Sequence, residues 1–130
     1  MQLSRVERKR FRLNFRIADH ASGKLPPWSL NRDMNLFAVI RTRGSAWQPS
    51  LPMEGQADWD VHASFMNARQ SEGFVLLGGP LEGTPDVLLV VRATSSDEIV
   101  DRLQSDPWTA RELLRLSRIT PWTLRLGSLP

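Results

Sequence analysis

The sequence predicts one α+β domain over residues 34–126, with the element order β-α-β-β-α-β. Three observations predict it. Runs of β-branched and large apolar residues mark short strands, and amphipathic stretches with capping residues mark helices between them. A bend rich in glycine and proline joins the two middle strands. This order is the ferredoxin-like arrangement, in which helices cover one face of the sheet.

The first strand is predicted over 35–43, where strand-forming residues are frequent. Because successive side chains of a strand point to opposite faces, two rows of side chains are expected. One row consists of Leu36, Ala38 and Ile40, and the other of Phe37, Val39, Arg41 and Arg43. The long loop over 44–56 carries Trp47 and two prolines, and we expect it to close over the site.

A first helix is predicted after this loop. Asp58 is a suitable N-cap, and Asp60 adds negative charge in the first turn. Gly73 is expected to end the helix in the left-handed conformation, followed by the apolar Phe74, as in a Schellman motif. One stripe of this helix is formed by Trp59, His62, Ala63, Met66 and Gln70.

The second half of the domain is predicted as a hairpin, two helices and a last strand. The hairpin pairs 74–78 with 86–92 across a glycine- and proline-rich bend. Ser95 and Glu98 form a capping box that opens a helix through Leu103. The remaining elements are a short extra helix that begins at Asp106-Pro107 and reaches about Leu114, and a strand over 116–126 kinked at Pro121.

Two helices on one face leave the other face of the sheet bare. In so small a domain, a bare apolar sheet face is normally buried by a partner. We therefore expect a homodimer in which two sheets pack face to face.

Composition excludes several classes of protein. Apolar residues make up 41% of the 130 residues and charged residues 24%, so the chain is neither disordered nor a membrane protein. The absence of cysteine excludes disulfides, thiolate metal sites and cysteine nucleophiles. A cytoplasmic location is the default expectation for such a chain.

The basic excess is confined to residues 1–33, which hold eight Lys or Arg against three acidic residues, whereas residues 34–130 hold nine Arg against eleven acidic residues. The domain itself is therefore not expected to bind nucleic acid. For residues 1–33 three interpretations stay open: a basic arm that touches phosphate, a tail without a role, or a segment upstream of a true start at Met34. We favour the last two and expect this extension to be disordered; residues 127–130 are expected to form a short tail.

His62 and Asp106 are the candidate catalytic residues. His62 is the only histidine of the domain and lies in the first turns of a helix, where unpaired amide groups favour the neutral imidazole. Asp106 lies where the second helix ends, and a carboxylate there can orient the imidazole. The alternatives are a surface or core histidine and an aspartate that only caps the helix beginning at Pro107.

Five further residues are candidates for substrate binding. Arg41 and Arg43 can hold an anionic group, although charged strand ends commonly reach water. Gly79 allows a ligand to approach the backbone, and Trp47 and Trp108 can line an apolar pocket; a turn and core packing are the alternative roles. One histidine with scattered acidic residues is too little for a metal site, so neither a metal nor an organic cofactor is expected.

Several short motifs together resemble the YCII-related (YciI-like) domain family. They are Phe37-Ala38-Val39-Ile40, His62 with Phe65-Met66, Glu72-Gly73-Phe74, Gly78-Gly79-Pro80-Leu81, Asp106-Pro107-Trp108 and Pro121-Trp122. The resemblance covers nearly all of residues 34–126. It implies a dimeric α/β barrel of ferredoxin-like protomers and a site that pairs a helix histidine with the aspartate of the Asp-Pro motif, here His62 and Asp106.

The leading functional hypothesis is a small cofactor-independent enzyme. His62, oriented by Asp106, would act as general acid and base in an elimination, isomerisation or hydrolysis of a small substrate, with an anionic group held by Arg41 or Arg43. The alternative is a non-catalytic homodimeric module that binds a small ligand or another protein. A third and weaker hypothesis is a nucleic-acid accessory protein that uses the basic arm.

Overall fold

The computed structural model describes residues 35–129, and the structural statements below refer to these residues. The elements are, in chain order, β1 (Asn35–Arg43), the 3₁₀ turn η2 (Met53–Gly55), α2 (Trp59–Ser71), β2 (Val75–Pro80), β3 (Asp86–Ala93), α3 (Ser96–Leu103), α4 (Pro107–Ala110) and β4 (Leu114–Pro121). The expectations for residues 1–33 and for a start at Met34 lie outside the described residues. No helix within 35–129 combines the length and the apolar character needed to cross a membrane.

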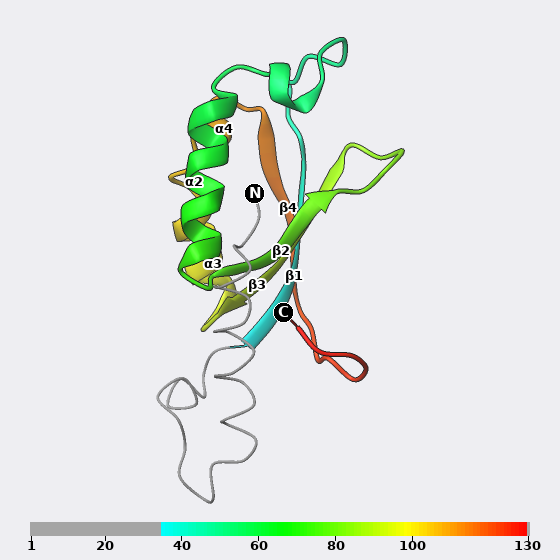
Figure 1. Cartoon of the computed structure of the whole chain (residues 1–130), viewed down its shortest axis with the longest axis vertical. Helices are drawn as coiled ribbons and strands as arrows, with labels where there is room; N and C mark the ends of the chain where they lie inside the picture. Colours follow the sequence, from blue (N-terminus) through cyan, green and yellow to red (C-terminus); the bar gives the residue numbers. More distant parts are fainter. Residues whose placement is uncertain (1–34, 130) are drawn as a thin grey trace, which may run out of the picture.

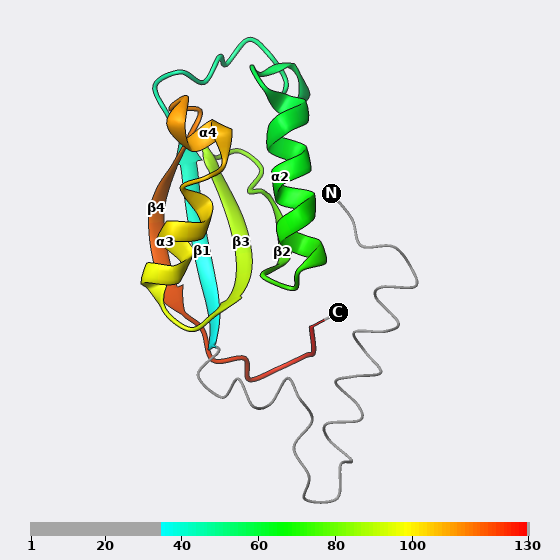
Figure 2. The same ribbon diagram turned by 90° about the vertical axis from the view of Figure 1, so that its left-hand side faces the viewer.

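The four strands form one antiparallel sheet in the order β2-β3-β1-β4, with β1 and β3 in the centre. The pairing of β2 with β3 confirms the predicted hairpin. All three helices lie on one face of this sheet (Figure 1). Figure 2 shows α2 alongside β2, and α3 in front of the central strands. The protein is therefore α+β with a four-stranded antiparallel sheet, which is compatible with the expected ferredoxin-like arrangement.

The core lies between the sheet and the helices and uses alternate residues of each strand. Phe37 and Val39 of β1 are buried on the helix side, and Val39 pairs with Leu89 of β3 and Ile119 of β4. The cluster of buried residues comprises Phe37, Val39, Met66, Phe74, Val75, Leu89, Val91, Ala93, Ile99 and Leu103. The next residue of the same row on β1 is Arg41, so the alternation of the strand carries a guanidinium group to the end of this core.

The predicted starts of α2, α3 and α4 are confirmed, but the expected side-chain cap of α2 is not formed. Ser95 and Asp106 each accept a hydrogen bond from a backbone N–H in the first turn of their helix. Asp58 makes no such bond, because its backbone is left-handed, with φ 57°, whereas a side-chain cap requires an extended backbone. Its carboxylate instead forms an ion pair with Arg111, which follows α4.

The predicted end of α2 is also confirmed. Gly73 has φ 79°, and the N–H of Phe74 donates to the carbonyl of Arg69 at 3.1 Å, as a Schellman motif requires. The strand after it differs from the prediction, because β2 continues past Gly78 to Pro80. A proline is tolerated there since β2 is an edge strand, whose outer N–H groups need no partner in the sheet.

The last two elements are shorter than predicted. α4 ends at Ala110, because Glu112 adopts a positive φ of 60° and turns the chain into β4. The strand predicted over 116–126 begins earlier and ends at Pro121. Pro121 pairs with β1 close to the first residue of that strand, so β4 has little of its neighbour left to pair with.

The second row of β1 faces away from the helices. It contains Leu36, Ala38 and Ile40, and β3 places Val90 opposite Ala38 and Leu88 opposite Ile40. None of the helices that the structure describes lies on this face (Figure 1). On the same face Arg92 pairs with Leu36, Thr120 with Ala38 and Arg118 with Ile40, so polar side chains flank these five residues. The five residues, here called the apolar outer face, form the surface on which the expected homodimer would form.

Truncation of Ile99 tests the packing of α3 on the sheet. Ile99 is fully buried, whereas its neighbour Val100 is 43% exposed on the same helix. We expect Ile99→Ala to lower the free energy of unfolding by about 2–5 kcal/mol, because it leaves a cavity in the core. Val100→Ala should change it by less than about 0.5 kcal/mol. Urea unfolding followed by tryptophan fluorescence measures both, and equal effects of the two substitutions would contradict the packing.

Candidate active site

Three ionisable side chains from distant parts of the sequence meet at the end of the core. Arg41 comes from β1, His62 from the first half of α2, and Asp106 is the N-cap of α4. Their exposed fractions are 2%, 4% and 0%. Buried charges are costly unless they are paired, so the mutual contacts of these residues, here called the buried triad, decide whether the arrangement is stable.

The carboxylate of Asp106 is the common partner of the triad. Arg41 Nη1 donates to Oδ2 at 2.8 Å, and His62 Nδ1 lies 2.9 Å from Oδ2 and 3.0 Å from Oδ1. The backbone N–H of Trp108 donates to Oδ1 at 3.0 Å. Arg41 is held from its other side by Thr109, whose hydroxyl accepts from Nη2 at 2.9 Å. Both oxygens of the buried carboxylate are therefore satisfied.

The electrostatics of the triad determine the protonation state of Asp106. Burial by itself raises the pKa of this carboxyl, but the hydrogen bond from His62 and the positive charge of Arg41 outweigh burial and hold the pKa of Asp106 below its usual range. An ionised carboxylate only accepts hydrogen bonds. The Nδ1 atom of His62 therefore carries the hydrogen, and in a neutral imidazole the lone pair is on Nε2.

Trp108 supports the imidazole and joins two parts of the chain. Its indole stacks on the ring of His62 with a centroid distance of 3.8 Å and an angle of 4° between the planes. Its Nε1 donates to the carbonyl of Ala57 at 2.6 Å, directly before α2. Trp47 packs edge-on against the same indole at 5.7 Å. These contacts fix the rotation of the His62 ring and the position of the helix that carries it.

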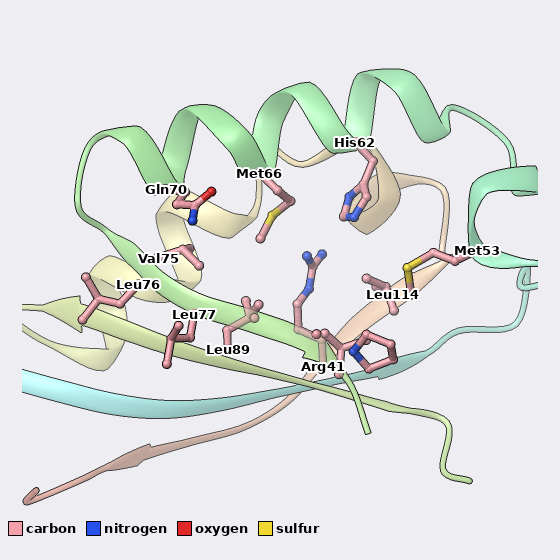
Figure 3. Close-up of a pocket in the computed structure, with 14 residues that line it drawn as sticks. Arg41, Met53, His62, Met66, Gln70, Val75, Leu76, Leu77, Leu89 and Leu114 are labelled. Atoms are coloured by element: carbon pink, nitrogen blue, oxygen red, sulfur yellow. The ribbon is translucent and has the colours of Figure 1, made fainter. Parts of the chain in front are cut away.

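A cavity of about 60 Å³ lies between α2 and the sheet, beside the triad (Figure 3). Its lining residues are Arg41, Met53, His62, Met66, Gln70, Val75, Leu76, Leu77, Gly78, Gly79, Pro80, Val87, Leu89 and Leu114. No residue within 35–129 makes a hydrogen bond to Nε2 of His62, whereas Nδ1 is bonded to Asp106. Since His62 lines the cavity, Nε2 is the ring nitrogen left for a molecule bound there.

The residues predicted to bind substrate fall into two groups. Arg41 and Gly79 line the cavity. Trp47 and Trp108 are buried behind the imidazole, and Arg43 lies over the Trp47 ring with 4.5 Å between its guanidinium and the ring centroid. The structure thus brings His62, Asp106, Arg41 and Trp108 together, and it leaves Arg43 and Trp47 outside the cavity lining.

Sequence reasoning missed that Arg41 is the ion-pair partner of Asp106. A signal was present, because the alternation of β1 puts Arg41 in the row of Phe37 and Val39, which faces the core, and a core arginine needs an acidic partner. The support from Thr109 left no comparable signal in the sequence. Among the described residues, no group of three histidine, aspartate or glutamate side chains is placed to hold a metal ion.

A double-mutant cycle tests the coupling of Arg41 to Asp106. Arg41→Met removes the permanent positive charge beside the buried Asp106, and Asp106→Asn removes the negative charge beside the buried Arg41, so each should lower the free energy of unfolding by about 3–5 kcal/mol. The double variant should lose about 1–3 kcal/mol less than the sum of the two, measured by urea unfolding. Arg115→Met, in a half-exposed pair with Glu112, should cost less than about 1 kcal/mol. Additive effects of the two buried substitutions would contradict the coupling.

Comparisons of this chain with models of protein families, with curated proteins and with solved structures find no match. The resemblance to YCII-related domains therefore stays a prediction from the sequence motifs. The site itself combines a buried carboxylate, paired with Arg41 and His62, with an imidazole that lines a mainly apolar cavity.

Proposed function

We propose that this protein is a small cofactor-independent enzyme of the YCII-like type, in which His62 acts as general acid and base on a small molecule bound in the cavity. One observation carries the proposal: the buried His62 is bonded through Nδ1 to the carboxylate of Asp106, while Nε2 makes no hydrogen bond within residues 35–129 and the side chain lines the cavity. A histidine that serves only the core would have both nitrogens satisfied by the protein.

The proposed chemistry is proton transfer at Nε2 of His62. In an isomerisation or elimination a substrate C–H or O–H bond breaks as Nε2 takes the proton, whereas in a hydrolysis an O–H bond of the attacking water breaks. The ionised Asp106 stabilises the imidazolium that forms. The proton then returns to another substrate atom in an isomerisation, or to a leaving group in an elimination or hydrolysis. Arg41 keeps Asp106 ionised, and the stacked Trp108 keeps the imidazole in the orientation that presents Nε2 to the substrate.

We further propose a homodimer of ferredoxin-like protomers that pack through the apolar outer face of the sheet. The strand order, with helices on one side only, supports this assembly. Four of the five residues of the apolar outer face (Leu36, Ala38, Ile40 and Leu88) are only partly buried within one chain. A second sheet packed on this face would therefore remove further apolar surface from water.

Replacement of His62 tests the proposed enzyme. Once a substrate has been found by screening small acidic C–H and O–H compounds, His62→Gln should lower kcat/KM by about 10²–10⁴-fold, because the general base is lost while the size of the side chain is kept. Steady-state kinetics measure the effect. The matched control is His20→Gln, at the only other histidine of the chain, which should leave kcat/KM unchanged.

The result also separates the enzyme from a non-catalytic binding module. Full turnover in His62→Gln would overturn the assignment of the general base. Saturable binding of a compound to the parent, with no chemical conversion of any compound in the screen, would favour the binding module instead.

A charge on the outer face tests the homodimer. Sedimentation equilibrium should give the parent twice the 14.8 kDa of one chain. Leu88→Glu should shift it to a monomer, because its neighbours across the sheet, Ile40 and Gly79, offer no cation and the dimer interface would then bury an unpaired carboxylate. Val100→Glu, on the exposed side of α3, should remain a dimer. A monomeric parent would contradict the proposed assembly without bearing on the role of His62.

A further inference from the structure

The charge balance around the cavity limits the substrate it can hold. Within the described lining, Arg41 is the only residue with a permanent charge, and that charge is paired with the carboxylate of Asp106. When the imidazole is neutral, the net charge of the buried triad is therefore zero. The other lining residues are apolar or glycine except for Gln70. A substrate that enters with a net negative charge would find no unpaired cation and would lose its hydration.

Transfer of a proton from a neutral substrate to His62 changes this charge balance in a way that favours the reaction. If a neutral substrate gives a proton to His62, the triad gains one positive charge as the substrate gains one negative charge. The two charges form side by side in a site of low dielectric constant, where their attraction is strong. Removing a proton from a substrate that is already anionic would instead leave one negative charge uncompensated.

The cavity has a polar group at the end distant from the triad. His62, Met66 and Gln70 lie beneath α2 in a row along the cavity (Figure 3). Gln70 is eight residues after His62, which is about 12 Å along a helix. The amide of its half-buried side chain makes no hydrogen bond within residues 35–129. Met66, Val75 and other apolar side chains occupy the space between these two ends.

We infer that the substrate is an uncharged, elongated molecule whose acidic C–H or O–H group meets His62, whose middle is apolar, and whose remote polar group is bound by the amide of Gln70. The volume of about 60 Å³ accommodates about four to six waters, which a substrate lying between His62 and Gln70 would displace. Gln70 is then a specificity residue, and Arg41 is a positioning residue for Asp106 that does not bind a substrate anion. This inference rests on the proposed acid–base function.

A set of three phenols tests the inference by binding alone. 4-Hydroxybenzamide, 4-hydroxybenzoate and 4-ethylphenol share the O–H group expected at His62, and they end in a neutral polar, an anionic and an apolar group. Methionine labelled with ¹³C in its methyl group reports binding, because Met53 and Met66 both line the cavity. We expect both methyl signals to shift, with 4-hydroxybenzamide binding about tenfold or more tightly than 4-hydroxybenzoate.

Substitution of Gln70 tests the remote contact. Gln70→Leu keeps the size of the side chain and removes its amide, so the preference for 4-hydroxybenzamide over 4-ethylphenol should fall about threefold to tenfold. Asn67→Leu is the matched control, since Asn67 is exposed on the same helix and does not line the cavity. It should leave the preference unchanged. Circular dichroism melting of each variant establishes that it is folded.

Each of three other results would contradict the inference. Equal or tighter binding of 4-hydroxybenzoate would refute the uncharged substrate, and absence of a shift at Met53 and Met66 with all three compounds would refute the cavity as the binding site. An unchanged preference in Gln70→Leu would refute the remote contact. Because these titrations need no turnover, they are independent of the kinetic test of His62, and the failure of one can be told from the failure of the other.

Discussion

The buried carboxylate of Asp106 is the interaction on which the rest of the structure depends. It receives hydrogen bonds from Arg41 on β1, from His62 on α2 and from the backbone of Trp108 in α4. One side chain therefore ties the central strand to two helices. Each of its three partners would lose a hydrogen bond in the interior without it, which makes the cluster costly to disrupt at any point.

The same cluster that holds the elements together also sets the tautomer and the orientation of the imidazole. Arg41 and His62 keep the pKa of Asp106 low in spite of burial, and the resulting carboxylate sets the tautomer of His62. The stacked indole of Trp108 restricts rotation of the ring, and its bond to Ala57 fixes the start of α2. In the proposed enzyme, stability and reactivity thus draw on one set of contacts, so substitutions in the triad must be assessed for folding as well as for turnover.

The cavity gives the proposed acid–base function its selectivity. Its charged group is neutralised internally, its walls are mainly apolar, and its one remaining polar side chain, Gln70, lies remote from the imidazole. Such a site favours charge that develops during proton transfer over charge that the substrate brings with it. The role of Arg41 follows from this view, because its guanidinium serves Asp106 and Thr109.

The sequence by itself determined the elements whose signals are local. The alternation of β1, the capping box at Ser95, the left-handed Gly73 and the Asp-Pro start of α4 were all predictable, because each depends on residues within a few positions of one another. The choice of His62 and Asp106 as candidates also needed only residue types and their places on helices.

Only the tertiary structure decided the contacts and boundaries that depend on distant residues. It paired Arg41 with Asp106 across 65 positions and turned the backbone of Asp58 left-handed beside Arg111. It also ended β4 where β1 offers few further partners. Such features depend on which elements meet in space, and local propensity carries no information on that.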